Sequence, residues 1–498
     1  MKSSPLIPCP FYIGGEWIHP KLVGTPIYNP STGDVIYECP AGGASEVAAA
    51  VEAADAAFPS WRDTPAIERA RFLFRYRHIV EENFDRLCTS ISLEHGKTLV
   101  ESRGSLYRGI ENIEYACGAP TLLFGSTLGN MARNVDCETH LQPLGVCVGI
   151  TPFNFPAMVP LWMFPLAIAC GNTFVLKPSE KVPLTAVLLI ELLAKAGLPK
   201  GVVNVVHGGR ECVDALLAHP KVRAVSFVGS SPVAKHIYDT ATRNGKRVQA
   251  NGGAKNHVIV MPDADIARSV EALTTAAFGC AGERCMAGST AIAVGEAGSA
   301  ILPQLVDAAR SVKIGRTDTP MSQPDMGPLI TKAHRDRVEE LVSSGEREGA
   351  TVACDGREMK VPGAPRGFYL GATIVDNVLE SMTLAREEVF GPVLNVMRME
   401  DLDQAIEVAN RSSYGNGASI FTSSGGAART FKHRVKAGMV GINVGVPATM
   451  AMFPFTGWDA SFYGDLHIQG QEAVQFYTQQ KTVTTRWFGG AVDDVWRK

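Results

Sequence analysis

The pattern of hydrophobic and polar positions changes character near residue 145. Before it, short apolar runs alternate with turn residues, Gly14-Gly15 and the stretch 29–33, which predict hairpins. Two helices follow. One is an alanine-rich helix over about 45–58, and the other opens at Thr64-Pro65, where threonine is expected to cap and proline to occupy the first turn.

After residue 145, strands and helices alternate. The short β-branched runs are GVCVGI, TFVLK, VVNVV and AVSFVG, and helices are predicted between them at about 158–170, 184–196 and 210–217. Such alternation predicts a parallel sheet covered by helices, with ligands at the carboxyl ends of its strands. A second α/β half is expected over about 254–450. The stretch 475–487 is expected to be a strand that pairs with another subunit.

Composition limits the classes of function. The 498 residues carry 47 basic and 50 acidic side chains without a long run of one sign, which disfavours nucleic acid as a partner. The eleven cysteines include no C-x-x-C pair, so neither a disulfide framework nor a metal site is expected. Residues 142–176 are uncharged but interrupted by five prolines, which predicts a buried core segment rather than a membrane helix. We expect a cytoplasmic protein.

Two strand ends could hold a dinucleotide, although the G-x-G-x-x-G pattern is missing. In AVSFVGSSPVAKHIY a strand is followed by Gly229 and Ser230 and then a helix start, whose free N–H groups suit a pyrophosphate. In TFVLKPSE, Lys177 and Glu180 could hold ribose hydroxyls. Taken alone, the first segment is better explained as an ordinary capped turn, and the second as a surface ion pair beside a turn.

Three further positions could carry chemistry. Cys285 lies among small residues in GCAGERCMAGS, and Arg284 beside it would favour the reactive thiolate. Asn154 in PFNFP is either a structural amide or a donor to an oxyanion. Glu388 in EEVFGPV precedes a turn that could present it to a ligand.

In their order along the chain, PFNFP, KPSE, FVGS, Cys285-Met286-Ala287, EEVFGPV and FYTQQKTV resemble the aldehyde dehydrogenase superfamily. The resemblance implies an α/β fold with a Rossmann-type NAD-binding domain, an α/β catalytic domain and a β oligomerisation arm. It implies that the Cys285 thiolate attacks an aldehyde while the Asn154 amide and the Cys285 N–H hold the oxyanion. The positions implied to contact NAD are Phe153, Lys177, Glu180, Gly229, Ser230, Glu388 and Phe390.

One departure points to a branch of that family. Hydrolytic members carry a glutamate 34 residues before the cysteine, and here that position is Asn251, which cannot act as a base. NGGAKNH and GERCMA resemble the methylmalonate-semialdehyde (malonate-semialdehyde) dehydrogenase branch, which transfers its acyl group to coenzyme A and yields propionyl-CoA or acetyl-CoA. Arg284, and Arg108 by position, would bind the substrate carboxylate. Arg108 could equally be a solvated helix residue.

The resemblance also implies a division into domains, and it leaves two alternative functions open. Residues 1–122 and 144–253 would form the NAD-binding domain, 254–450 the catalytic domain, and 123–143 with 470–498 the arm of a homotetramer, a dimer of dimers. Trp458 and Tyr463 replace small or basic residues where the family lines its substrate tunnel. The alternatives are a hydrolytic dehydrogenase of another carboxy-aldehyde, such as succinate semialdehyde, and a non-catalytic protein on the same fold.

Overall fold

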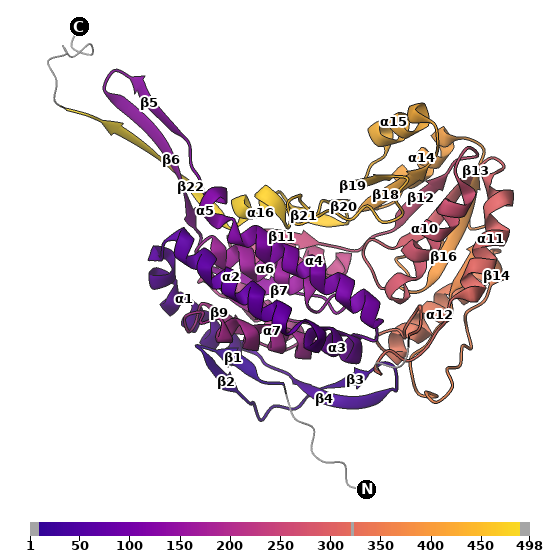
Figure 1. The fold of residues 1–498 in the computed structure, drawn as a ribbon, viewed down its shortest axis with the longest axis horizontal. Coiled ribbons are helices and arrows are strands. Elements are labelled where there is room, and N and C mark those ends of the chain that lie inside the picture. The colour runs from indigo at the N-terminus through magenta and orange to yellow at the C-terminus, as the bar shows by residue number, and fades with distance from the viewer. Residues whose placement is uncertain (1–8, 320–322, 489–498) are drawn as a thin grey trace.

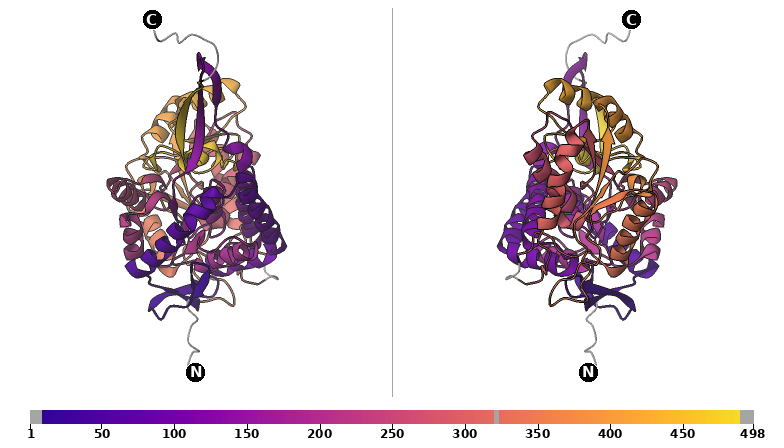
Figure 2. Two further views of the ribbon diagram at one scale, coloured as in Figure 1. Left: turned by 90° about the vertical axis from the view of Figure 1, so that its left-hand side faces the viewer. Right: turned by 90° about the vertical axis from the view of Figure 1, so that its right-hand side faces the viewer.

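Two sheets with separate helical layers and one projecting arm make up the molecule (Figures 1 and 2). The computed structural model describes residues 9–319 and 323–488. The first half of the chain forms the larger sheet. The second half forms the other sheet, and the chain end returns to the first sheet and to the arm.

The first sheet has eight strands. In spatial order they are β2 (Glu16–Ile18), β1 (Phe11–Ile13), β9 (Val203–Val205), β8 (Thr173–Lys177), β7 (Val146–Ile150), β10 (Val222–Val228), β11 (Arg247–Asn251) and β21 (Phe462–Gly464). The five strands from β9 to β11 are parallel, as the alternating pattern predicts. The chain runs outward from β7 through β8 to β9, then crosses to β10 on the other side. This reversal beside β7 is where open α/β sheets bind ligands.

Helices cover both faces of this sheet. The core cluster on one face includes residues of α1 (Ala44–Asp63), α8 (Arg210–Ala218) and α9 (Ser231–Arg243). The other face is covered by α2 (Ala66–Glu82), α3 (Phe84–His95), α4 (Leu99–Cys117), α6 (Met158–Ala169) and α7 (Pro183–Lys195). The uncharged stretch after residue 142 is therefore mostly β7, α6 and β8, in the interior.

The boundary between α1 and α2 differs from the sequence prediction. Thr64 ends α1, where its N–H donates to the Trp61 oxygen at 3.2 Å, and its hydroxyl donates to the Ser60 oxygen at 2.9 Å. The Thr64 hydroxyl thus bonds to the preceding helix α1 and does not cap α2. Pro65 takes the N-cap position of α2 in place of threonine.

The two predicted hairpins near the N-terminus are present. Strands β1 and β2 pair across Gly14-Gly15, and β3 (Gly24–Asn29) pairs with β4 (Asp34–Pro40).

The second sheet has seven strands and its own core. Their order is β14 (Thr351–Cys354), β15 (Thr373–Asp376), β16 (Val393–Met399), β13 (Gly288–Val294), β12 (Asn256–Val260), β18 (Gly417–Phe421) and β19 (Met439–Ile442). The helices of this half are α10 (Ile266–Phe278), α11 (Ala297–Ser311), α12 (Lys332–Arg347), α13 (Thr383–Arg386), α14 (Leu402–Asn410) and α15 (Gly425–Arg434). The domain boundaries themselves stay a prediction.

The arm is a three-stranded sheet, β22 (Thr478–Arg486), β6 (Val135–Pro143) and β5 (Thr127–Ala132), that extends away from the body (Figure 1). The terminal strand has a partner in its own chain that the sequence did not reveal, and its pairing with another subunit stays a prediction. β22 pairs antiparallel with β6 of its own chain, from Thr478 opposite Pro143 to Arg486 opposite Val135. Local sequence could not reveal this pairing because the strands are more than 300 residues apart. Residues 489–498 of the expected arm lie outside the described residues.

The connection from β11 to β12 joins the two halves, with Asn251 at one end and Asn256 at the other. Within the described residues, no helix is both long enough and apolar enough to cross a membrane.

Candidate active site

Cys285 lies in a tightly held loop between a short helical turn (Gly279–Gly282) and β13. Cys280, Ala281 and Gly282 have φ angles of 53°, 51° and 73°, so three consecutive residues are in the left-handed region. The main-chain oxygen of Cys285 accepts hydrogen bonds from Asn256 Nδ2 at 2.8 Å and from Asn416 Nδ2 at 2.9 Å. These contacts from the starts of β12 and β18 fix the position of the cysteine.

The side of Cys285 that faces the first half of the molecule lines a cavity of about 280 Å³. Its walls come from α4, α6, the cysteine loop and the segment 446–455. They include Arg284, Arg108, Phe155, Met158 and Trp162. A second, much smaller hollow touches Cys285 together with Glu388 and Phe390. The cysteine therefore lies between a substrate-sized cavity and the carboxylate predicted to face a cofactor.

Burial is the main influence on the acidity of Cys285. Burial raises its pKa to about 12, and the charge of Glu388 adds to this shift. The N–H groups of Cys285 and Met286 and the nearby Arg284 act in the opposite direction but are weaker. The charge of Arg284 favours the thiolate, in the direction expected from the sequence, but desolvation of a buried anion outweighs this neighbouring cation.

Asn154 is brought to the cysteine loop. Its side-chain Nδ2 donates to the main-chain oxygen of Glu283 at 3.2 Å, and its own main-chain oxygen accepts from Lys97 Nζ at 2.6 Å. The side chain is buried. One amide hydrogen is thus used to bind the loop, and the other is available to a ligand.

A buried charged cluster behind the loop was missed by sequence reasoning. Glu283 is fully buried, and its Oε1 accepts from the Ile330 N–H at 3.1 Å while its Oε2 lies 3.8 Å from His95 Nε2. Burial raises the pKa of Glu283 to about 8 and lowers that of His334 to about 4. The position of Glu283 beside Arg284 and Cys285 was the available signal, but a charged residue in a loop is ordinarily solvated.

The two arginines line the Cys285 cavity together. Arg284 Nη2 donates to the last carbonyls of α10, at Thr275 and at Ala276 (3.0 Å), and its buried Nε is without a partner among the described residues. Arg108 forms an ion pair with Glu111 at 3.0 Å, one helical turn along α4. Arg284 is the more buried cation, and Arg108 is half-exposed and already paired.

The predicted dinucleotide positions fall at the carboxyl ends of the first sheet. Lys177 ends β8, and its Nζ lies 3.1 Å from Glu180 Oε2. Gly229 and Ser230 follow β10, and the Ser230 side chain makes no capping bond at the start of α9. A Cβ at residue 229 would collide with the Phe227 ring, so this turn requires glycine. The strands β8 and β10 flank β7, at the reversal described above.

The remaining predicted cofactor positions are Glu388 and Phe390 in the second half of the chain, and Phe153 after β7. Glu388 Oε1 accepts from the Ala254 N–H at 2.8 Å, and burial raises its pKa to about 7. The Phe153 ring packs edge-on against Phe390 at 5.8 Å, and Lys181 Nζ lies 4.7 Å from the Phe153 ring. Aromatic and acidic groups from both halves of the chain therefore meet near Cys285.

Two positions singled out from the sequence lie differently from expectation. Neither Trp458 nor Tyr463 lines the Cys285 cavity. Trp458 lies in the short strand β20 (Trp458–Asp459) and pairs with Gly415. Tyr463 lies in β21 and packs on Tyr238 of α9. Their departure from the family pattern therefore lies outside the walls of this cavity.

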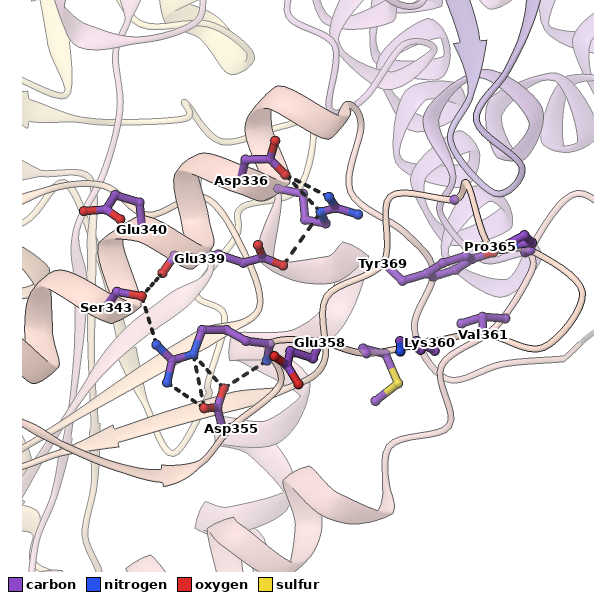
Figure 3. Close-up of a pocket in the computed structure, with 15 residues that line it drawn as sticks. Asp336, Glu339, Glu340, Ser343, Asp355, Glu358, Lys360, Val361, Pro365 and Tyr369 are labelled. Atoms are coloured by element: carbon purple, nitrogen blue, oxygen red, sulfur yellow. Dashed lines mark hydrogen bonds and ion pairs between the residues drawn. The ribbon is translucent and has the colours of Figure 1, made fainter.

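A larger cavity, of about 1030 Å³, lies beside α12 and does not involve the predicted residues (Figure 3). Its two arginines are already engaged in ion pairs. Arg357 binds Asp355 at 2.6 Å and Arg335 binds Asp336 at 2.8 Å. We therefore centre the site on Cys285.

Comparison with known proteins agrees with this geometry. Residues 17–483 match the model described as the aldehyde dehydrogenase family. The chain belongs to this family. Malonate-semialdehyde dehydrogenase 2 of Geobacillus kaustophilus (strain HTA426) is 50% identical over 477 residues, which are 96% of this chain and 98% of that protein. Malonate-semialdehyde dehydrogenase of Pseudomonas aeruginosa is 49% identical, over 95% of each chain.

Solved structures extend the aldehyde dehydrogenase likeness to three dimensions. The crystal structure of methylmalonate-semialdehyde dehydrogenase from Oceanimonas doudoroffii superposes with a TM-score of 0.96 at 48% identity, and covers 97% of this chain and 99% of that one. A structure from Sinorhizobium meliloti 1021, solved in complex with NAD, has a TM-score of 0.96 at 42% identity, with 99% and 100% covered. The predicted fold class and the resemblance to this branch of the family are confirmed.

Proposed function

We propose that the protein oxidises malonate or methylmalonate semialdehyde with NAD and transfers the acyl group, with loss of CO₂, to coenzyme A. The observation that carries this proposal is the cavity that joins Cys285 to Arg284 and Arg108, in a chain about half identical to malonate-semialdehyde dehydrogenases. A nucleophile beside two cations suits a small aldehyde that bears a carboxylate.

Cys285 supplies the attacking sulfur. Its raised pKa means that the free enzyme holds a neutral thiol, which must lose its proton before the sulfur adds to the aldehyde carbon. The N–H groups of Cys285 and Met286 that face the sulfur stabilise the negative charge. Oxidation of the adduct leaves a thioester on Cys285.

The free hydrogen of the Asn154 amide and the Cys285 N–H suit the oxygen of that adduct. Both donors are fixed before the substrate arrives, since Asn154 is tied to Glu283 and the cysteine loop is held by two asparagines. Preorganised donors stabilise a developing oxyanion without reorganisation in the transition state.

The substrate carboxylate would bind the Arg284 guanidinium group, with Arg108 as the second cation that lines the cavity. Arg284 is the stronger ligand of the two because it is less exposed than Arg108 and its Nη2 is anchored by main-chain carbonyls. Arg108 would have to exchange its ion pair with Glu111 for the substrate.

Asn251 explains why the acyl group is transferred to coenzyme A and not to water. Its side chain is buried, and neither Oδ1 nor Nδ2 has a partner among the described residues. An amide cannot take a proton from water, and general-base help contributes about 10²–10⁴-fold. The thioester on Cys285 therefore resists hydrolysis and persists for a thiol nucleophile such as coenzyme A.

The residues at the carboxyl ends of β8 and β10 fit NAD. The open start of α9 at Ser230, next to a glycine that allows close approach, suits the pyrophosphate, and Lys177 with Glu180 suits ribose hydroxyls. A carboxylate at Glu180 would oppose a 2′-phosphate. Glu388, Phe390 and Phe153 would hold the nicotinamide end. Bound NAD would supply the hydride acceptor.

We further propose that the arm assembles the chain into a homotetramer, a dimer of dimers, in the cytoplasm. The outer strands β5 and β22 are sheet edges, and Leu128 on β5 is 61% exposed. Such edges and apolar side chains are normally covered by a partner. The eleven free cysteines fit a reducing compartment.

The test measures NADH formation from malonate semialdehyde and NAD, with and without coenzyme A, and identifies the products by mass spectrometry. We expect sustained turnover only with coenzyme A, and acetyl-CoA as product. Cys285→Ala should abolish NADH formation, while Cys137→Ala in the arm should not. Asn251→Glu should release free acid without coenzyme A. Rapid thiol-independent turnover by the wild-type enzyme, or preference for succinate semialdehyde, would refute the proposal.

A further inference from the structure

The turn between α3 and α4 contacts both loops of the candidate active site. Gly96 ends α3 with a φ of 93°, and Thr98 begins α4 as its N-cap. The turn is itself held by other segments, since Thr317 Oγ1 donates to the Gly96 oxygen at 2.9 Å and a Cβ at residue 96 would press on Pro328. Residues 96–101, here called the α3–α4 turn, are therefore a fixed base for the side chains they carry.

Lys97 holds the loop that carries Asn154. The lysine is 1% exposed, its Nζ donates to the Asn154 main-chain oxygen at 2.6 Å, and Nζ lies 3.8 Å from the centre of the Phe155 ring. A buried ammonium group is costly unless its surroundings compensate the charge. Burial lowers the pKa of Lys97, and the nearby Cys280 and Glu101 act most strongly in the opposite direction. One cation therefore binds both the backbone of Asn154 and the ring that follows it.

Glu101 holds the cysteine loop. Thr98 and Glu101 form a capping box, in which Thr98 Oγ1 accepts from the Glu101 N–H at 3.2 Å and Glu101 Oε2 accepts from the Thr98 N–H at 2.9 Å. This pairing fixes the carboxylate and leaves Oε1 for a second donor. Oε1 accepts a hydrogen bond from the Cys280 N–H. The cap of α4 therefore reaches the loop of the nucleophile.

The cysteine loop needs such an anchor. Cys280 has a φ of 53°, a strained conformation that persists in residues other than glycine only where the surroundings hold it. The Cys280 oxygen accepts from the Glu283 N–H at 2.9 Å, so the turn that leads to Cys285 begins at the residue that Glu101 binds. Asn154 Nδ2 binds the same turn at the Glu283 oxygen. The two loops and the α3–α4 turn thus form one closed set of contacts.

We propose that Lys97 and Glu101 are positioning residues, which together hold Asn154 and the cysteine loop at the separation that the oxyanion needs. This inference rests on the proposed function, in which the Asn154 amide and the Cys285 N–H bind the oxygen of the adduct. Lys97 and Glu101 act through these donors and do not have to touch the reacting atoms. A misplacement of about 1 Å can reduce a rate by about 10²-fold, so the anchors of both donors affect the reaction.

The experiment replaces each anchor by methionine, which has a similar length and lacks an N–H group and an oxygen. The rate at which the first equivalent of NADH forms from malonate semialdehyde, without coenzyme A, measures formation of the thioester. Lys97→Met and Glu101→Met should each lower this rate and kcat by about 10–10²-fold. KM should change little, because the substrate carboxylate would bind Arg284, whose Nη2 is held by α10.

Thr98→Ala is the matched control in the same turn. It removes the hydroxyl cap of α4 and leaves the bonds of Lys97 to Asn154 and of Glu101 to Cys280 in place. It should lower the melting temperature, as loss of a cap does, with little change in kcat. Glu101→Gln keeps an oxygen for the Cys280 N–H and should recover most of the rate that Glu101→Met loses. If Thr98→Ala slows the enzyme as much as the anchor variants do, helix stability accounts for the effect and the inference is wrong.

Double variants show which donor each anchor serves. Lys97→Met should slow Asn154→Ala by less than about twofold, since the amide that Lys97 positions is gone, whereas Glu101→Met should still slow it by about tenfold. A full effect of Lys97→Met in Asn154→Ala would overturn its role. Melting temperatures establish that each variant is folded, and Glu101→Met with its glutamine rescue tests the inference by itself where Lys97→Met is not.

The outcomes for the inference and for the proposed function are distinct. Wild-type rates in both Lys97→Met and Glu101→Met would overturn the inference, and a slow Asn154→Ala would then leave the proposed oxyanion pair standing. A fast Asn154→Ala would instead refute that pair, and the inference with it.

Discussion

The side-chain amide of Asn154 donates a hydrogen bond to the main-chain oxygen of Glu283, 3.2 Å away and two residues before Cys285. This bond joins the loop after β7 in the first half of the chain to the cysteine loop in the second. The same Asn154 residue accepts a 2.6 Å bond from the buried Lys97. One amide thus positions the nucleophile's loop and still offers a hydrogen to an oxyanion.

Asn154→Ala should lower kcat by about 10²–10³-fold, the usual effect of removing one oxyanion donor. Asn154→Asp retains the size of the side chain but lacks the N–H, so it should be similarly slow. Steady-state NADH formation measures both. Asn244→Ala, an exposed amide at the end of α9, is the control. A loss of less than threefold in both Asn154 variants would remove this amide from the reaction.

The raised pKa of Cys285 predicts slow alkylation of the free enzyme at neutral pH. Because the pKa is about 12, the rate of reaction with iodoacetamide should increase about tenfold for each pH unit between pH 7 and pH 10. Mass spectrometry of the labelled peptide follows Cys285 specifically.

Glu388 contributes to that shift as a nearby negative charge, so Glu388→Gln should lower the pKa of Cys285 and speed alkylation at a given pH. Glu387→Gln, next to it, serves as the control. A plateau in the wild-type rate below pH 9 would contradict the burial argument.

The sequence predicted the order of strands and helices over 145–230 because each element there has a complete local signal. Gly197 after α7 and the β-branched run of β8 are examples. The pairing of β22 with β6 and of β21 with β11 could not be predicted, since these partners are distant in the chain and lack a common pattern.

Site residues that belong to a sequence motif were predictable. Properties that depend on contacts between distant parts of the chain were not. Cys285 and Asn154 came from motifs, and the structure brings their loops together. The effect of Arg284 on the Cys285 thiol was predictable from the sequence, but the larger opposing effect of burial on the pKa was not, because burial is not visible in the neighbouring residues. Glu283 was missed because charged residues in loops are ordinarily exposed.

Glu283 predicts a pH-dependent stability. Its pKa in the folded protein is about 8, above the ordinary value of 4.5, so the folded state favours the neutral carboxylic acid. The resulting stability is fully present below pH 4.5 and is lost as the pH rises toward 8. Glu283→Gln keeps an acceptor for the Ile330 N–H but cannot ionise, so it should raise the melting temperature at pH 8 and change it little at pH 5. Calorimetry at both values tests this, and an equal shift at the two pH values would contradict it.

Gly282 predicts that space, more than backbone strain, decides how the cysteine loop tolerates substitution. Its φ is +73°, and a Cβ there would collide with the main-chain oxygen of Gly391, in the segment that carries Glu388. Gly349, with a φ of +103°, has open space around the same position. Alanine at either site should cost about 1–2 kcal/mol for the left-handed conformation.

Only Gly282→Ala should also push the cysteine loop and the Glu388 segment apart, and so reduce kcat as well as stability. Gly349→Ala should retain full activity with a similar loss of stability from strain. Paired measurements of kcat and melting temperature separate the two contributions. If both variants lose the same stability and keep the same kcat, the contact between Gly282 and Gly391 does not position the nucleophile.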